Sequence, residues 1–102
     1  MKVKLIGTIY PVKVSYAAGQ DPEALAAESA RARLASFGDA SAVGMFSYPL
    51  TRDSAEVDVS YEVTTDVDTD DPVQAEFLAK FRFGIFLGNL GLGDNSTAVA
   101  FP

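Results

Sequence analysis

Acidic side chains are concentrated between residues 53 and 71, which hold eight of the 14 Asp and Glu residues in this 102-residue sequence. Six of them occupy even-numbered positions, so a β-strand would align them in one row: Glu56, Asp58, Glu62, Asp66, Asp68 and Asp70. Residues two apart on a strand are separated by roughly 6.6–6.8 Å, close to the separation of successive phosphates on a DNA strand. We predict a solvated sheet face whose charges prevent aggregation. The alternative is that this row binds a basic protein partner.

The same stretch contains the beginning of a calcium-loop pattern. Residues 66–71 read D-x-D-x-D-D, but a calcium loop needs Gly at the sixth position and Glu at the twelfth. Here those positions hold Asp71 and Phe77. Asp71 is better explained as the cap of a helix that begins at the following proline. We therefore predict no metal site and no cofactor.

A second candidate surface is the apolar segment 81–93, in which Arg82 is the one charged residue. If the segment is helical, it is apolar on nearly every side, and one small sheet cannot cover all of it. We predict a homo-oligomer that forms through this segment. The residues predicted to mediate self-association are Phe83, Phe86, Leu87 and Leu90. The alternative is a helix that ends near Phe83, followed by a loop that folds back onto the core.

The residue types that are missing argue against most catalytic chemistry. The sequence has no Cys and no His, so thiolate nucleophiles are excluded and the commonest general base is absent. The net charge of −6 and the scattered lysines and arginines disfavour direct binding of nucleic acid. No run approaches the roughly 20 apolar residues of a membrane span. A non-enzymatic, cytoplasmic protein that does not bind membranes is expected.

Two helices should position these surfaces. Asp21-Pro22 and Asp71-Pro72 each place a capping carboxylate before a proline, which is typical of a helix start. The first helix is predicted over 22–37, ended by Gly38, with Ala26, Ala30, Leu34 and Phe37 as its buried stripe. The second is predicted to start at Val73, and Gly84 and Gly88 leave its end open. It carries Phe77, Leu78, Phe81 and Ile85 at helical spacing.

Strands are predicted before and after each helix. Residues 3–16 alternate in two phases that change at Tyr10-Pro11, which indicates one long strand with a bulge. Residues 42–50 form the second predicted strand. The third has valines and Tyr61 at odd positions and the acidic row at even ones, which is typical of a strand with one solvated face. A short fourth strand is predicted over 98–101.

The order β-α-β-β-α-β predicts one α+β domain over residues 1–102, a ferredoxin-like two-layer sandwich. Its four-stranded antiparallel sheet would have both helices on one face. Because the first and third strands are central neighbours in this fold, Lys2, Lys4 and Lys13 should form ion pairs with the acidic row.

These observations favour a non-enzymatic protein-interaction or assembly domain that self-associates through its apolar segment. An acidic inhibitor that mimics nucleic acid is the alternative, and a small enzyme or ligand-binding domain is the third. The first role ranks higher because an uncovered apolar helix needs a partner, whereas an acidic face can simply be solvated.

Overall fold

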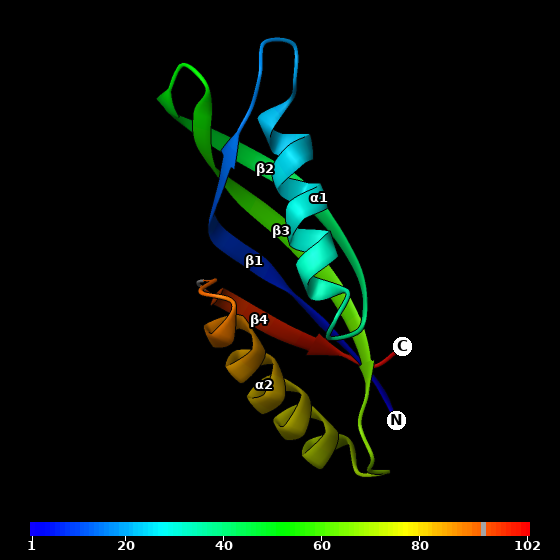
Figure 1. Cartoon of the computed structure of the whole chain (residues 1–102). Coiled ribbons are helices and arrows are strands. Elements are labelled where there is room, and N and C mark those ends of the chain that lie inside the picture. The colour runs from blue at the N-terminus through cyan, green and yellow to red at the C-terminus, as the bar shows by residue number, and fades with distance from the viewer. Residues whose placement is uncertain (93) are drawn as a thin grey trace.

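The chain folds into a four-stranded antiparallel sheet and two helices, so it is an α+β protein (Figure 1). The structure is a computed structural model that describes residues 1–92 and 94–102, with the side chains of 94–96 excepted. In chain order the elements are β1 (Lys2–Ser15), α1 (Pro22–Leu34), β2 (Asp39–Thr51), β3 (Ser54–Asp66), α2 (Pro72–Asn89) and β4 (Asp94–Ala100). The predicted order of elements is confirmed, and it fits the ferredoxin-like arrangement.

The strands lie in the order β2-β3-β1-β4, so β3 and β1 occupy the centre of the sheet. β3 and β1 pair along almost their whole length, whereas β4 pairs with β1 only between Lys4 and Ile9. The register of β1 against β3 shifts between Ile9 and Val12. This shift is the predicted bulge, and the Tyr10–Pro11 peptide bond within it is cis.

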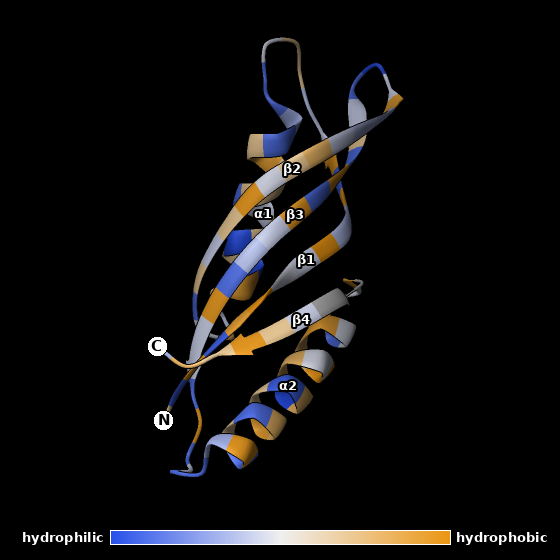
Figure 2. Cartoon of the chain, turned by 180° about the vertical axis from the view of Figure 1, so that it is seen from behind, coloured by the Kyte–Doolittle hydropathy of each residue, from blue (hydrophilic) through white to orange (hydrophobic). Residues whose placement is uncertain are grey.

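Alternate residues of the two central strands are buried, as the period of two predicts. The buried row of β3 consists of Ala55, Val57, Val59, Tyr61 and Val63. On α1, the predicted residues Ala26, Ala30 and Leu34 are buried against the sheet. The small side chains of Ala26 and Ala30 allow the helix to approach closely, and at Gly44 of β2 a Cβ atom would collide with the backbone carbonyl of Glu23. The sheet face turned away from α1 is called the open face below (Figure 2).

Both predicted helix starts are confirmed. Asp21 accepts a hydrogen bond from the backbone N–H of Glu23, and Asp71 accepts one from Val73, each at 3.0 Å. The predicted end of the first helix at Phe37 is wrong by three residues, because α1 already ends at Leu34. Phe37 nevertheless packs against the core.

The second helix continues through both glycines that left its end open. It ends at Asn89, where Gly91 adopts a left-handed φ of 69°. The backbone N–H of Leu92 donates to the carbonyl of Leu87, and that of Gly91 to the carbonyl of Gly88, each at 3.1 Å. This pair of bonds is the Schellman motif, in which glycine adopts the left-handed conformation without steric cost.

Candidate interaction surfaces

The residues predicted for self-association lie on the inner side of α2. Phe83 and Leu87 are each only 1% exposed, and Phe86 and Leu90 are partly buried. A side chain that its own chain already covers cannot contact a second chain, so the prediction needs correction for Phe83 and Leu87. Their row, completed by Ala75 and Ala79, packs into the core instead. Gly93, the last residue of the predicted segment, lies outside the described residues.

The opposite side of α2 carries a row of exposed apolar side chains, called the outer stripe here. It comprises Val73, Phe77, Phe81 and Ile85, which are 75%, 66%, 58% and 52% exposed. The rings of Phe77 and Phe81 stack with their centroids 6.0 Å apart. Val73 and Phe77 also line a hollow of about 510 Å³ together with Gln74 and Leu78. The stripe is therefore continuous and has a recess at its N-terminal end.

Charged residues border the outer stripe without interrupting it. Lys80 lies 4.0 Å from Glu76 along one border, and Arg82 is exposed on the other. Gly84 and Gly88 lie within the same helical face, since residues three or four apart are neighbours there. A Cβ atom at either glycine would meet nothing within 4 Å. Packing within the chain therefore gives no reason for glycine at these two positions.

The acidic row divides between two places. Glu56, Asp58, Glu62 and Asp66 belong to β3 and lie on the open face, opposite in phase to its buried valines. Asp68 and Asp70 are exposed in the connection from β3 to α2. The β3 strand therefore presents four of the six predicted residues together.

One of the predicted ion pairs with β1 is present on the open face. The Nζ atom of Lys4 lies 3.7 Å from Oε2 of Glu62, and both side chains are well exposed. The register also places Lys2 opposite Asp66 and Lys13 opposite Glu56. In the described part of the chain, however, no second ion pair joins these two strands. Exposed pairs of this kind contribute little to stability.

An aromatic cluster, formed by Tyr10, Phe46 and Tyr48, adjoins the acidic row on the open face. The ring of Tyr48 on β2 lies 6.1 Å from that of Tyr10 on β1 and 6.4 Å from that of Phe46. Because β3 lies between β1 and β2, the two tyrosine rings meet above β3. The sequence pattern does not place Tyr10 beside Phe46 and Tyr48, because β1 and β2 are brought together only through their pairing with β3.

Asp58 of β3 lies next to the aromatic cluster, directly opposite Phe46 in the register of β2 and β3. The hydroxyl of Tyr48 donates a hydrogen bond of 3.3 Å to Oδ2 of Asp58. The negative charge of this carboxylate is the main reason why the pKa of Tyr48 lies above its ordinary value. Oδ1 of Asp58 is covered and has no hydrogen-bond partner among the described residues.

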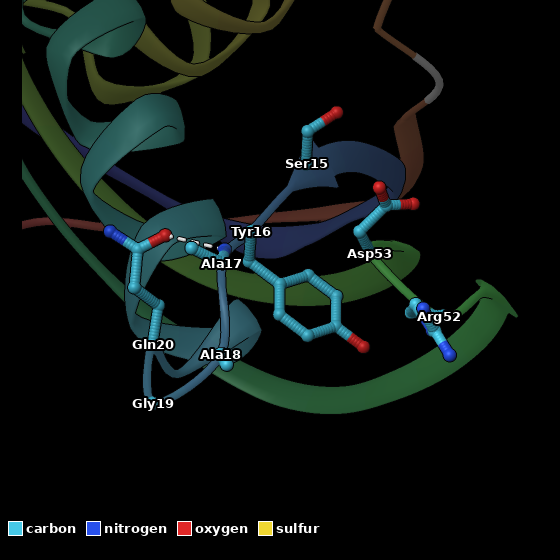
Figure 3. A pocket seen from close by; sticks show the side chains of 8 residues that line it. All are labelled: Ser15, Tyr16, Ala17, Ala18, Gly19, Gln20, Arg52 and Asp53. Atoms are coloured by element: carbon cyan, nitrogen blue, oxygen red, sulfur yellow. Dashed lines mark hydrogen bonds between the residues drawn. The ribbon is translucent and has the colours of Figure 1, made fainter.

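A larger hollow of about 720 Å³ lies at one tip of the molecule, between the β1–α1 connection and the β2–β3 turn. Figure 3 shows the ring of Tyr16 between the backbone of residues 17–20 and Arg52. Within this connection, the side-chain oxygen of Gln20 accepts a hydrogen bond from the backbone N–H of Ala17 at 2.8 Å. The carboxylate of Asp53 accepts one from Thr51 within the turn. These polar groups therefore stabilise the two loops that form the hollow.

The remaining predictions concern metals and membranes. Among the side chains that the structure describes, no group of three or more Asp and Glu residues is arranged to hold a metal ion. Neither α1 nor α2 has the length and hydropathy of a transmembrane helix.

Comparison with models of protein families, with curated proteins and with solved structures finds no match for the chain.

Proposed function

We propose that the chain is a non-enzymatic assembly domain that self-associates through the outer stripe of α2. The observation that carries the proposal is the exposure of four large apolar side chains in one uninterrupted row. Contiguous apolar surface on a folded domain usually marks an interaction site, because covering it removes apolar area from water. The absence of His and Cys from the sequence supports a role without catalysis.

A second copy of the chain fits this surface because the stripe is complementary to itself. In an isologous dimer the two α2 helices pack antiparallel around a two-fold axis near the middle of the stripe. Ile85 of one copy then faces the recess beside Val73 and Phe77 of the other. Gly84 and Gly88 leave room on this face for side chains of the other copy, since neither glycine has a side chain of its own.

Replacing both Phe77 and Phe81 with Asp tests the surface. We expect the parent chain to be dimeric or larger and the double variant to be monomeric and folded, because neither phenylalanine contributes to the core. Sedimentation equilibrium at several concentrations measures the mass. Val43→Asp is the matched control, since Val43 is 62% exposed but lies on β2. A parent that is monomeric at high micromolar concentration, or a double variant that remains oligomeric, contradicts the proposal.

The antiparallel arrangement has a test of its own, because the chain contains no cysteine and an introduced thiol is unique. A mixture of the Val73→Cys and Ile85→Cys variants should form a disulfide-linked dimer on oxidation, whereas neither variant alone should do so. Helices that pack parallel would instead link each variant to itself. Cross-linking therefore reports the relative direction of the two helices, whereas sedimentation reports whether a dimer forms at all.

An acidic inhibitor of a nucleic-acid-binding protein is the second candidate function. The observation in its favour is the position of Glu56, Asp58, Glu62 and Asp66 on one strand of the open face. On this function the partner is a basic protein, and its binding weakens as salt screens the row. Self-association ranks first because removing exposed apolar surface from water is favourable, whereas exposed carboxylates are stable when solvated.

We also propose that the fold is the two-layer sandwich with both helices on one face of the sheet. In support, the ring of Phe83 on α2 contacts Tyr61 of β3 and Phe37, which follows α1, with centroids 5.4 Å and 5.0 Å apart. The two helices thus contribute to one core cluster.

We also propose that the protein is located in the cytoplasm.

A further inference from the structure

The aromatic cluster and Asp58 form an arrangement that a solvated acidic face does not require. Tyr10 and Tyr48 come from the two strands that flank β3, and their rings meet above the strand that carries Asp58. The three aromatic residues Tyr10, Phe46 and Tyr48 are nevertheless 40%, 63% and 47% exposed. Large aromatic surfaces are thus held in water around a carboxylate, although nothing in the core depends on them.

The carboxylate itself is incompletely paired. Oδ2 of Asp58 accepts one long bond from Tyr48, whereas Oδ1 is shielded from water and has no donor among the described residues. Leaving a shielded oxygen of a charged group without a donor costs free energy, and native structures rarely do so without a reason. A donor from outside the chain would remove this cost.

The chemistry of the missing donor follows from its neighbours. Aromatic faces attract cations, and arginine is the side chain that both stacks on such faces and donates two parallel hydrogen bonds to one carboxylate. We propose that Tyr10, Phe46, Tyr48 and Asp58 form a binding site for the guanidinium group of an arginine on a basic protein partner. The remaining acidic residues of β3 supply the negative field that attracts such a partner.

This site lies on the open face and is distinct from the outer stripe of α2, so it does not depend on self-association. It sharpens the second candidate function, because it names one side chain of the partner and the residues that receive it. A diffuse acidic face would treat all its carboxylates alike. The proposed site requires that Asp58 matter more than Glu62 or Asp66.

A peptide of glycine and serine with one arginine and blocked ends is the probe, because its only charge is the guanidinium group. The chain has no Trp and four Tyr, two of which belong to the aromatic cluster, so tyrosine fluorescence reports binding directly. We expect a saturable change that a matched lysine peptide produces only at about tenfold higher concentration, since lysine neither stacks nor pairs in a bidentate manner. Equal binding of the two peptides, or none at millimolar concentration, overturns the proposal.

Variants then locate the site. Asp58→Asn and Tyr48→Ala should each weaken binding of the arginine peptide by about tenfold, because they remove the carboxylate charge and an aromatic face. Glu62→Gln and Asp66→Asn each remove one charge from the surrounding field and should weaken binding by only about twofold, because these two carboxylates do not contact the guanidinium group in the proposed site. A similar loss of affinity in Asp58→Asn, Glu62→Gln and Asp66→Asn would assign binding to the whole acidic row and contradict the proposed site. Thermal unfolding confirms that each variant is folded, and sedimentation shows separately whether the outer stripe still associates.

Discussion

At the scale of single residues, Asp58 and Tyr48 show how one carboxylate changes its neighbour. The charge of Asp58, and to a smaller extent its hydrogen bond to Tyr48, favour the neutral form of the phenol, so the pKa of Tyr48 is raised above its ordinary value of about 10. Burial of the ring contributes in the same direction. The folded chain therefore holds this proton more tightly than the unfolded chain does.

Tyrosine titration followed by ultraviolet absorbance should detect this effect. Tyr48 of the parent should ionise at higher pH than free tyrosine, and Tyr48→Phe should remove that component. In Asp58→Asn the same component should move to lower pH. By linkage, the stability that the pair contributes is present below a pH of about 10 and is lost as the pH rises further. A titration unchanged by Asp58→Asn would show that the two groups do not interact.

Sequence reasoning identified the carboxylates of this site but not its rings. The alternation of valine and acidic residues in β3 assigns each side chain to a face, because a strand has a period of two. Tyr10 lies within the register shift between Ile9 and Val12, and Phe46 follows another, between Gly44 and Phe46. Each shift changes the phase of its strand, so the face of a residue beside it depends on pairing that the pattern does not specify.

At the scale of elements, α2 is apolar on two sides, which is why its exposed side was predicted incorrectly. The helix has two apolar rows, one with Phe77, Phe81 and Ile85 and one with Phe83 and Leu87. Helical periodicity finds both rows and cannot decide which one faces the sheet. The inner row is the one that includes Ala75 and Ala79, whose small side chains let the helix approach the sheet. Phe83 then fills the remaining space against Tyr61.

Alanine at Gly84 of α2 and alanine at Gly44 of β2 should have opposite effects on stability. Gly84→Ala should raise the stability of the monomer by about 0.5–1 kcal/mol, because alanine favours a helix and its methyl group meets no atom. The same change should weaken self-association, since it adds a side chain within the proposed interface. Gly44→Ala should lower stability, because its Cβ atom collides with the carbonyl of Glu23.

Denaturant midpoints at low protein concentration give the stabilities, and sedimentation gives the association. Stronger association of Gly84→Ala would place the glycines outside the interface. A Gly44→Ala variant as stable as the parent would mean that α1 is further from β2 than the structure indicates.

At the scale of the whole molecule, the order of elements was predictable because each one has its own local signal. Two Asp-Pro caps, a strand with one acidic side and a bulged strand leave few arrangements of the chain. The length of the elements was less predictable. Both outer strands begin before their predicted first residues, β2 at Asp39 and β4 at Asp94, since pairing with a neighbour recruits residues whose own pattern is not strand-like. The result is an elongated molecule of 50 × 20 × 18 Å.

The edge strand β2 affects solubility, because an unpaired strand edge can pair with another chain. β2 is a long edge strand with exposed apolar residues, which in general invites pairing with another chain. Two register shifts and Pro49 interrupt it, and a proline has no N–H to offer. These features disfavour association through β2 and leave the outer stripe of α2 as the better candidate.

The partial pairing of β1 with β4 divides this central strand into two parts with different access to solvent. Residues 4–9 have a strand on each side, whereas residues 12–15 pair with β3 alone among the described residues. Alternate backbone amides of the second part therefore point away from β3, to the side where no described strand pairs with them. In deuterated water their protons should be replaced much sooner than those of residues 4–9, which separate only when the sheet opens. Amide exchange followed by NMR would then show loosening that begins at the tip beyond the bulge and reaches the four-stranded half last.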